Sequence, residues 1–100
     1  MKFEFEDDGL RTLYEEGKGQ ERYPPEVVRA FFRRMAVIAG ARDKRDLYQV
    51  KSLHFERLKR SEEDRSIRLN RDWRLILVVD KSDPAGTVVR IREINRHYGD

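Results

Sequence analysis

The sequence contains no cysteine and only two histidines among its 100 residues. Without cysteine, disulfide bridges and thiolate metal sites are excluded, and two histidines are few for a histidine-based metal site. No apolar run approaches the roughly 20 residues of a membrane-spanning helix. The N-terminal stretch MKFEFEDDGL lacks the apolar segment of a signal peptide. We therefore expect a soluble, cytoplasmic protein that needs neither a metal nor another cofactor.

The length predicts a single domain over residues 1–100 with one modest core. Charged residues make up 41% of the chain, and the formal net charge is +3. Positions 51–100 hold twelve basic and nine acidic residues, against ten of each in positions 1–50, so the excess lies in the C-terminal half. Arginine outnumbers lysine sixteen to six, and its planar guanidinium suits phosphate. This balance favours an anionic partner such as nucleic acid.

The N-terminal half predicts one strand and two helices. In KFEFE, residues 2–6, phenylalanine alternates with charge, as in a half-buried strand. A helix capped by Asp7 or Asp8 should follow and end at Gly17. A second helix should run from Pro24-Pro25 to Gly40. Its apolar residues recur every three or four positions and predict a buried stripe of Val28, Phe31, Phe32, Met35, Ile38 and Ala39.

The C-terminal half predicts a β-sheet. Residues 42–50 suit one short helical turn, and residues 51–65 suit either a loop or an irregular edge strand. Strands are expected at about 65–69, 73–80 and 87–94, the last two separated by the turn signal KSDPAG. The order β-α-α-β-β-β predicts an α+β fold in which two helices cover one face of a largely antiparallel sheet of about four strands.

The stretch SIRLNRDWRLIL places two arginines within the best predicted hairpin. Side-chain parity requires Ile67 and Leu69 to share a face with Trp73 and the leucines after it. A three-residue loop at 70–72 satisfies this requirement, whereas a two-residue loop would mix the faces. The same register sets Arg68 opposite Arg74 on the other face. Like charges in that position destabilise a sheet by up to roughly 1 kcal/mol, which is understandable if an anion lies between them.

Arg90 and Arg92 alternate with apolar residues in the last strand and could extend the same positive face. The sheet would then have an apolar face under the helices and a basic face open to a phosphate-bearing partner. A plainer interpretation also fits the pattern. The arginines could be surface residues whose aliphatic stems lie over Ile76 and Val78.

Histidine and lysine residues near this face supply candidate chemistry. His97 and Tyr98 follow the last strand and could exchange protons at the end of the arginine face. His54 is a second candidate proton carrier, or a residue that packs near the sheet edge. Lys59 is a candidate phosphate contact, or a solvated loop lysine. Arginines that hold a phosphate, with a histidine beside them, are the minimal parts of a metal-free ribonuclease, in which the RNA 2′-hydroxyl attacks the adjacent phosphate.

The motif LHFERLK followed by SIRLNRDWRL closely resembles the HigB, or plasmid-maintenance killer, branch of the RelE/ParE toxin superfamily. The order of elements fits as well, so the resemblance spans nearly the whole chain. It implies a RelE-like fold and a type II toxin that cleaves mRNA on the translating ribosome. It also implies a neutralising antitoxin, usually a helix-turn-helix HigA-like protein that represses the operon, so that operator DNA is a partner only through the antitoxin.

The resemblance assigns roles by position. Arg68 and Arg74 match the strand arginines, Lys59 matches the lysine of an LKG turn, and His54 matches the histidine five residues before it. Basic residues of the sheet, here with Arg90 and Arg92, would hold RNA, and a histidine or tyrosine near the C-terminus would transfer protons. Relatives commonly end the last strand with Asp-Tyr-His, where this chain has Arg96-His97-Tyr98, and Arg60 replaces the usual glycine.

Three functions follow from these observations. The first is a ribosome-dependent mRNA endonuclease that inhibits translation, with Arg68, Arg74, His97 and Tyr98 as catalytic residues. The second is a ParE-like toxin that inhibits a protein such as DNA gyrase, for which intact mRNA beside DNA breaks would be diagnostic. The third is a non-catalytic RNA-binding or antitoxin-binding remnant, which would bind RNA in a salt-sensitive way without arresting growth.

Overall fold

The computed structural model describes residues 1–80 and 82–96. It is an α+β fold in which helices lie against a five-stranded sheet. The elements in chain order are β1 (Lys2–Phe5), α1 (Asp8–Glu16), η1 (Gln20–Arg22), α2 (Pro25–Gly40), α3 (Lys44–Gln49), η2 (Lys51–Leu53), β2 (Glu56–Arg57), β3 (Asp64–Arg68), β4 (Trp73–Val79) and β5 (Val88–Arg96).

The two predicted helices form where their terminal signals indicate. At the start of α1, the Leu10 backbone N–H donates to the Asp7 carboxylate at 2.9 Å, and Gly17 ends the helix with a φ of 71°. Such a left-handed conformation suits glycine because it lacks a Cβ. Helix α2 has proline in its first turn, where no backbone N–H is needed.

The sheet has the strand order β1-β5-β4-β3-β2 and is antiparallel except for the parallel pair β1–β5. The prediction of about four strands was short by one, because β2 has only two residues and pairs with β3 through Glu56 and Arg57. The ambiguous segment 51–65 therefore contains a short edge strand. The expected helical turn in residues 42–50 is present as α3.

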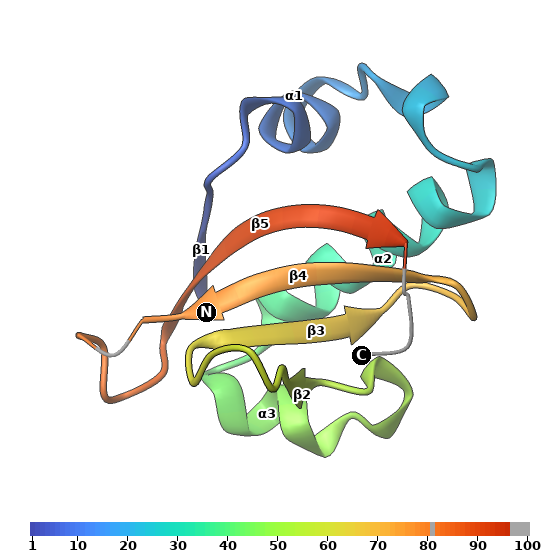
Figure 1. Cartoon of the computed structure of the whole chain (residues 1–100). Helices are drawn as coiled ribbons and strands as arrows, with labels where there is room; N and C mark the ends of the chain where they lie inside the picture. The colour runs from blue at the N-terminus through green and yellow to red at the C-terminus, as the bar shows by residue number, and fades with distance from the viewer. Residues whose placement is uncertain (81, 97–100) are drawn as a thin grey trace.

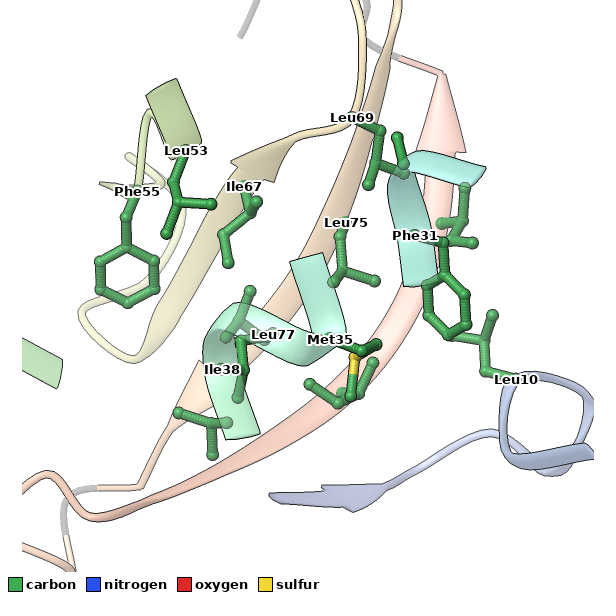
Figure 2. Close-up of a cluster of buried hydrophobic side chains, with 14 of the residues drawn as sticks. Leu10, Phe31, Met35, Ile38, Leu53, Phe55, Ile67, Leu69, Leu75 and Leu77 are labelled. Atoms are coloured by element: carbon green, nitrogen blue, oxygen red, sulfur yellow. The ribbon is translucent and has the colours of Figure 1, made fainter. Parts of the chain in front are cut away.

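The core fills the space between α2 and one face of the sheet (Figures 1 and 2). Figure 2 shows Phe31, Met35 and Ile38 of α2 facing leucines and isoleucines of the strands. The predicted stripe is wrong at Ala39, which is exposed near the end of α2, whereas Ala30 is buried. The complete set of buried apolar residues on α2 is Val27, Val28, Ala30, Phe31, Met35 and Ile38.

The hairpin β3–β4 has the register that side-chain parity predicts. Ile67 pairs with Leu75, Arg68 pairs with Arg74, and the Leu69 N–H donates to the Trp73 carbonyl at 2.9 Å. Trp73 is half-buried and meets Tyr23 edge-to-face, with ring centroids 6.0 Å apart. The three-residue loop 70–72 thus keeps the apolar residues on the face that α2 covers.

We call the opposite side of the sheet the outer face, and Figure 1 is viewed from that side, with α2 behind β4. Ile76 and Val78 belong to this face by alternation along β4, and they lie outside the main core cluster. Both are nevertheless buried, with 3% and 1% of their surface exposed. Side chains of the neighbouring strands must therefore cover them. The aliphatic stems of long charged residues can do so while their charged ends remain in water.

Candidate functional site

The two strand arginines lie directly opposite each other near the closed end of the hairpin. Arg68 on β3 and Arg74 on β4 are paired residues, and both are half-buried. The Arg74 Nη1 group donates to the carbonyl of Asn70 at 3.2 Å and, at 3.4 Å, to that of Trp73. The hairpin loop therefore holds one guanidinium of the pair through backbone acceptors.

The loop itself is organised by Asn70. Its side-chain oxygen accepts hydrogen bonds from the backbone N–H groups of Asp72 and Trp73, each at 2.9 Å. Its side-chain amide donates to the Glu26 carboxylate on α2 at 3.2 Å. Asparagine side chains commonly bond to the backbone two residues ahead and so stabilise turns. Asn70 thus fixes the loop whose carbonyl receives Arg74.

The electrostatic environment disfavours the charge of Arg74. Burial lowers the pKa of its guanidinium, and the neighbouring charge of Arg68 lowers it further. Neither arginine forms an ion pair with a carboxylate of the described residues. Two like charges without a counter-ion are attractive to an anion, and the guanidinium fork matches phosphate oxygens.

His54 lies beside this pair. Its Nε2 atom is 3.5 Å from Nη1 of Arg68, and its side chain is exposed. The residue has a φ of 49°, an uncommon conformation for a residue other than glycine. The contact places an imidazole next to a cationic binding group.

Arg68 also carries an unsatisfied donor. Its Nε atom is buried and has no hydrogen-bond partner among the described residues. An unpaired buried donor costs roughly 1–3 kcal/mol. The described residues therefore leave one donor of Arg68 unsatisfied.

Arg90 and Arg92 lie on the outer face, but both are neutralised. Their Nε groups each donate to the Glu6 carboxylate at 2.8 Å, and Arg92 also donates to Asp64 at 3.0 Å. Arg90 makes a second ion pair with Asp80. A bulge in β5, opposite Ile76 and Leu77, leaves Arg92 without a partner residue on β4.

We call this set the ion-pair ladder; its members are Glu6, Arg60, Asp64, Asp80, Arg90 and Arg92. Hydrogen bonds from the two β5 arginines hold the pKa of Glu6 below its ordinary value. Val78 lies between two members, because its pairing partners are Asp64 and Arg90. The ladder therefore accounts for the burial of Val78 on the outer face.

The remaining candidates lie apart from these contacts. Lys59 is exposed in the loop between β2 and β3, and no hydrogen bond or ion pair joins it to another described residue. His97 and Tyr98 lie outside the described residues. The predicted site thus brings together Arg68, Arg74 and His54.

Sequence reasoning missed the residues that support or neutralise the arginines. Asn70 carried a local signal, since asparagine at the first position of a short loop suggests a turn. Glu6 and Asp80 carried none, because they meet Arg90 only when β1 and β4 flank β5. Arg34, whose Nε donates to the Arg68 carbonyl at 3.0 Å, lies outside the apolar stripe that the sequence predicts for its helix.

The described residues contain neither a membrane-spanning helix nor a cluster of metal ligands. None of the helices in residues 1–80 and 82–96 is long and apolar enough to cross a membrane. The same residues contain no group of three or more histidine, cysteine or acidic side chains placed to hold a metal ion.

The chain was also compared with known proteins. A comparison with curated proteins finds none that matches. A family model described as the RelE-like toxin of the type II toxin-antitoxin system HigB matches residues 3–87. That range begins within β1, includes all elements from α1 to β4, both arginines of the hairpin and His54, and ends before β5 begins. The chain therefore belongs to the HigB-like toxin family, whose members are RelE-like toxins of type II toxin-antitoxin systems.

Proposed function

We propose that this toxin is an endoribonuclease that cleaves mRNA on the translating ribosome. The observation that carries the proposal is the pair Arg68 and Arg74, which oppose each other without a carboxylate partner in the described part of the chain. A scissile phosphate between the two guanidinium groups would satisfy both. It would also turn a repulsive contact into two charge-assisted interactions.

The proposed reaction uses the RNA itself as the nucleophile. The 2′-hydroxyl attacks the adjacent phosphorus and loses its proton to a base, while the bond from phosphorus to the 5′-oxygen breaks. The leaving oxygen takes a proton from an acid, and the products are a 2′,3′-cyclic phosphate and a 5′-hydroxyl. Charge accumulates on the phosphoryl oxygens in the transition state, so the fixed guanidinium groups of Arg68 and Arg74 would stabilise that state more than the substrate.

We assign proton transfer to histidine and tyrosine side chains. His97 and Tyr98 are the proposed proton carriers near the C-terminus, and His54, whose Nε2 lies 3.5 Å from Arg68 Nη1, is proposed as a further one. Lys59 would contact the RNA from its exposed loop. Arg90 and Arg92 would bind RNA only where a phosphate replaces Glu6 or Asp64 as their partner.

Type II toxins act with an antitoxin, and we propose a helix-turn-helix HigA-like protein as the partner here. Operator DNA would then be reached only through that protein. The cytoplasm is the expected location, because both mRNA and ribosomes are found there.

The test is inducible expression in a bacterium, followed by mapping of transcript 5′ ends. Wild type should arrest growth and create new 5′ ends within translated regions. Arg68→Ala and His97→Ala should abolish both effects. Arg45→Ala is the matched control, because Arg45 is an exposed arginine that already pairs with Asp43 at 2.9 Å, and it should behave as wild type.

Three results would contradict the proposal. Unchanged toxicity and cleavage in Arg68→Ala and His97→Ala would refute the site. Intact transcripts together with DNA breaks would indicate a gyrase poison instead. Salt-sensitive RNA binding without growth arrest would indicate a non-catalytic remnant.

A further inference from the structure

We infer that Arg33 and Arg34 on α2 form a second phosphate subsite, which holds the RNA backbone next to the phosphate bound by Arg68 and Arg74. This inference rests on the proposed function and extends it from one phosphate to a strand. The ligand class is a single-stranded polyribonucleotide. We call the two residues the helix arginines.

The contact that links the subsites is a hydrogen bond between helix and sheet. The Arg34 Nε group donates to the backbone carbonyl of Arg68 at 3.0 Å, although the two residues are 34 positions apart. Strand β2 pairs with β3 only at Arg65 and Ser66, so Arg68 lies beyond the end of this edge pairing. Arg34 therefore lies at the edge of β3 beside Arg68, the residue proposed to bind the scissile phosphate.

The charge of the helix arginines is not neutralised. Arg34 is half-buried, and burial lowers the pKa of its guanidinium, with a further lowering by the adjacent charge of Arg33. Neither residue forms an ion pair with a described carboxylate, and the two Nη groups of Arg34 have no hydrogen-bond partner within residues 1–80 and 82–96. By contrast, Arg90 and Arg92 are each paired with two carboxylates.

The position of the helix arginines favours RNA over another anion. Burying an arginine without a counter-ion is unfavourable, and Arg34 remains fixed because its Nε is anchored to β3. Its remaining donors are thus held next to the strand that carries Arg68. A polynucleotide places further phosphates on both sides of the scissile one, so a strand that crosses the β3 edge would reach both subsites. An isolated inorganic anion would reach only one.

The experiment measures binding of the full chain to a fluorescein-labelled 12-nucleotide RNA with 2′-O-methyl groups throughout, which cannot be cleaved by its own 2′-oxygens. Anisotropy titrations at several KCl concentrations give the slope of log K against log [KCl]. Each phosphate contact on a single strand contributes about −0.7 to that slope. Arg33→Gln/Arg34→Gln removes one phosphate contact and should therefore reduce the magnitude of the slope by about 0.7, and Arg33→Gln alone should reduce it by less.

Matched variants distinguish loss of this subsite from a general loss of positive charge and from unfolding. Arg42→Gln and Arg45→Gln remove exposed arginines that are paired with Asp46 on α3 and with Asp43 just before it, and should leave the slope unchanged. Arg34→Lys keeps the charge and should retain most of the slope. If Arg34→Gln fails to fold, as judged by circular dichroism, Arg33→Gln and Arg34→Lys still test the proposal.

The inference is overturned if the helix-arginine variants bind the 12-mer with the wild-type slope. It is also overturned if they lose binding to polyglutamate while RNA binding stays intact, because the surface would then serve an acidic protein. A 2′-O-methyl dinucleotide monophosphate should bind wild type and the double variant equally, since it has one phosphate. Wild-type cleavage by Arg68→Ala would refute the proposed function alone, because the slope measurement does not depend on cleavage.

Discussion

If Arg68 and Arg74 repel each other in the free protein, removing either one should relieve the fold of that repulsion. The perturbation is a double-mutant cycle of Arg68→Gln, Arg74→Gln and the double variant. Glutamine retains much of the stem and some hydrogen-bonding capacity while removing the charge. The first substitution removes the repulsion, and the second then has none left to remove.

The magnitude follows from the geometry. The two residues are directly opposite on neighbouring strands, where a like-charge pair destabilises by up to about 1 kcal/mol. Both are half-buried, and the charge of Arg68 contributes to the lowered pKa of Arg74, so full solvent screening does not apply. We therefore expect Arg74→Gln to be more favourable in wild type than in Arg68→Gln by about 0.3–1 kcal/mol. For a domain of this size, 1 kcal/mol corresponds to roughly 4–8 °C in Tm.

Urea unfolding followed by the fluorescence of Trp73, the single tryptophan, measures each free energy of unfolding. Because the Debye length falls from about 10 Å at 0.1 M salt to about 3 Å at 1 M, the coupling should shrink in 1 M NaCl. Inorganic phosphate at ten times its Kd should stabilise wild type by about 1.4 kcal/mol, and should not stabilise the double variant.

A coupling of zero or of favourable sign at low salt would refute the reasoning, because the pair would then not be in electrostatic conflict. The cycle of Arg90→Gln and Glu6→Gln is the control and should give coupling of the opposite sign.

Three further predictions concern the rest of the sheet. The pKa of Glu6 is held below its ordinary value of 4.5, so the free energy of unfolding measured at pH 3–6 should fall as the pH drops below about 4.5. Glu6→Gln should flatten this dependence, and an unchanged pH profile in that variant would contradict the proposed role of Glu6 in the ion-pair ladder. Ile76→Ala should destabilise by about 2 kcal/mol in urea unfolding, because the side chain is only 3% exposed; a change near zero would mean that the outer face does not cover it. Gly86→Ala should lower Tm by the equivalent of about 1–2 kcal/mol, since Gly86 has a φ of 67° and a Cβ would lie 2.8 Å from Lys44 Cγ; a wild-type Tm would show that the turn can rearrange.

The hairpin could be predicted from sequence because its register depends on local side-chain alternation. Strand residues alternate between faces, so the positions of Ile67, Leu69 and Trp73 allow one register with a short loop. That register places Arg68 opposite Arg74, and the structure has this pairing. The helices were predictable for a similar reason, since their apolar spacing and their terminal residues lie within one segment.

Contacts between distant segments could not be predicted in this way. Alternation along β5 suggested that Arg90 and Arg92 face the partner side, but it carried no information about the carboxylates of β3 and of the segments after β1 and β4. The bulge at Arg92 also has no signal in a pattern of strict alternation. Edge strand β2 was ambiguous because two residues are too few to show a period.

The distribution of acids over the outer face has a consequence for binding. At one end, the ion-pair ladder lets arginines cover Val78 while their charge is cancelled by Glu6, Asp64 and Asp80. At the closed end of the hairpin, the acceptors that Arg74 meets are backbone carbonyls, which hold a guanidinium in place and leave its full charge. A polyanion that approaches this face therefore gains the most electrostatic energy at the closed end, because binding to the ion-pair ladder would first require its phosphates to displace carboxylates. Positioning of RNA on this face of the sheet can thus arise from where the acids are, as well as from where the arginines are.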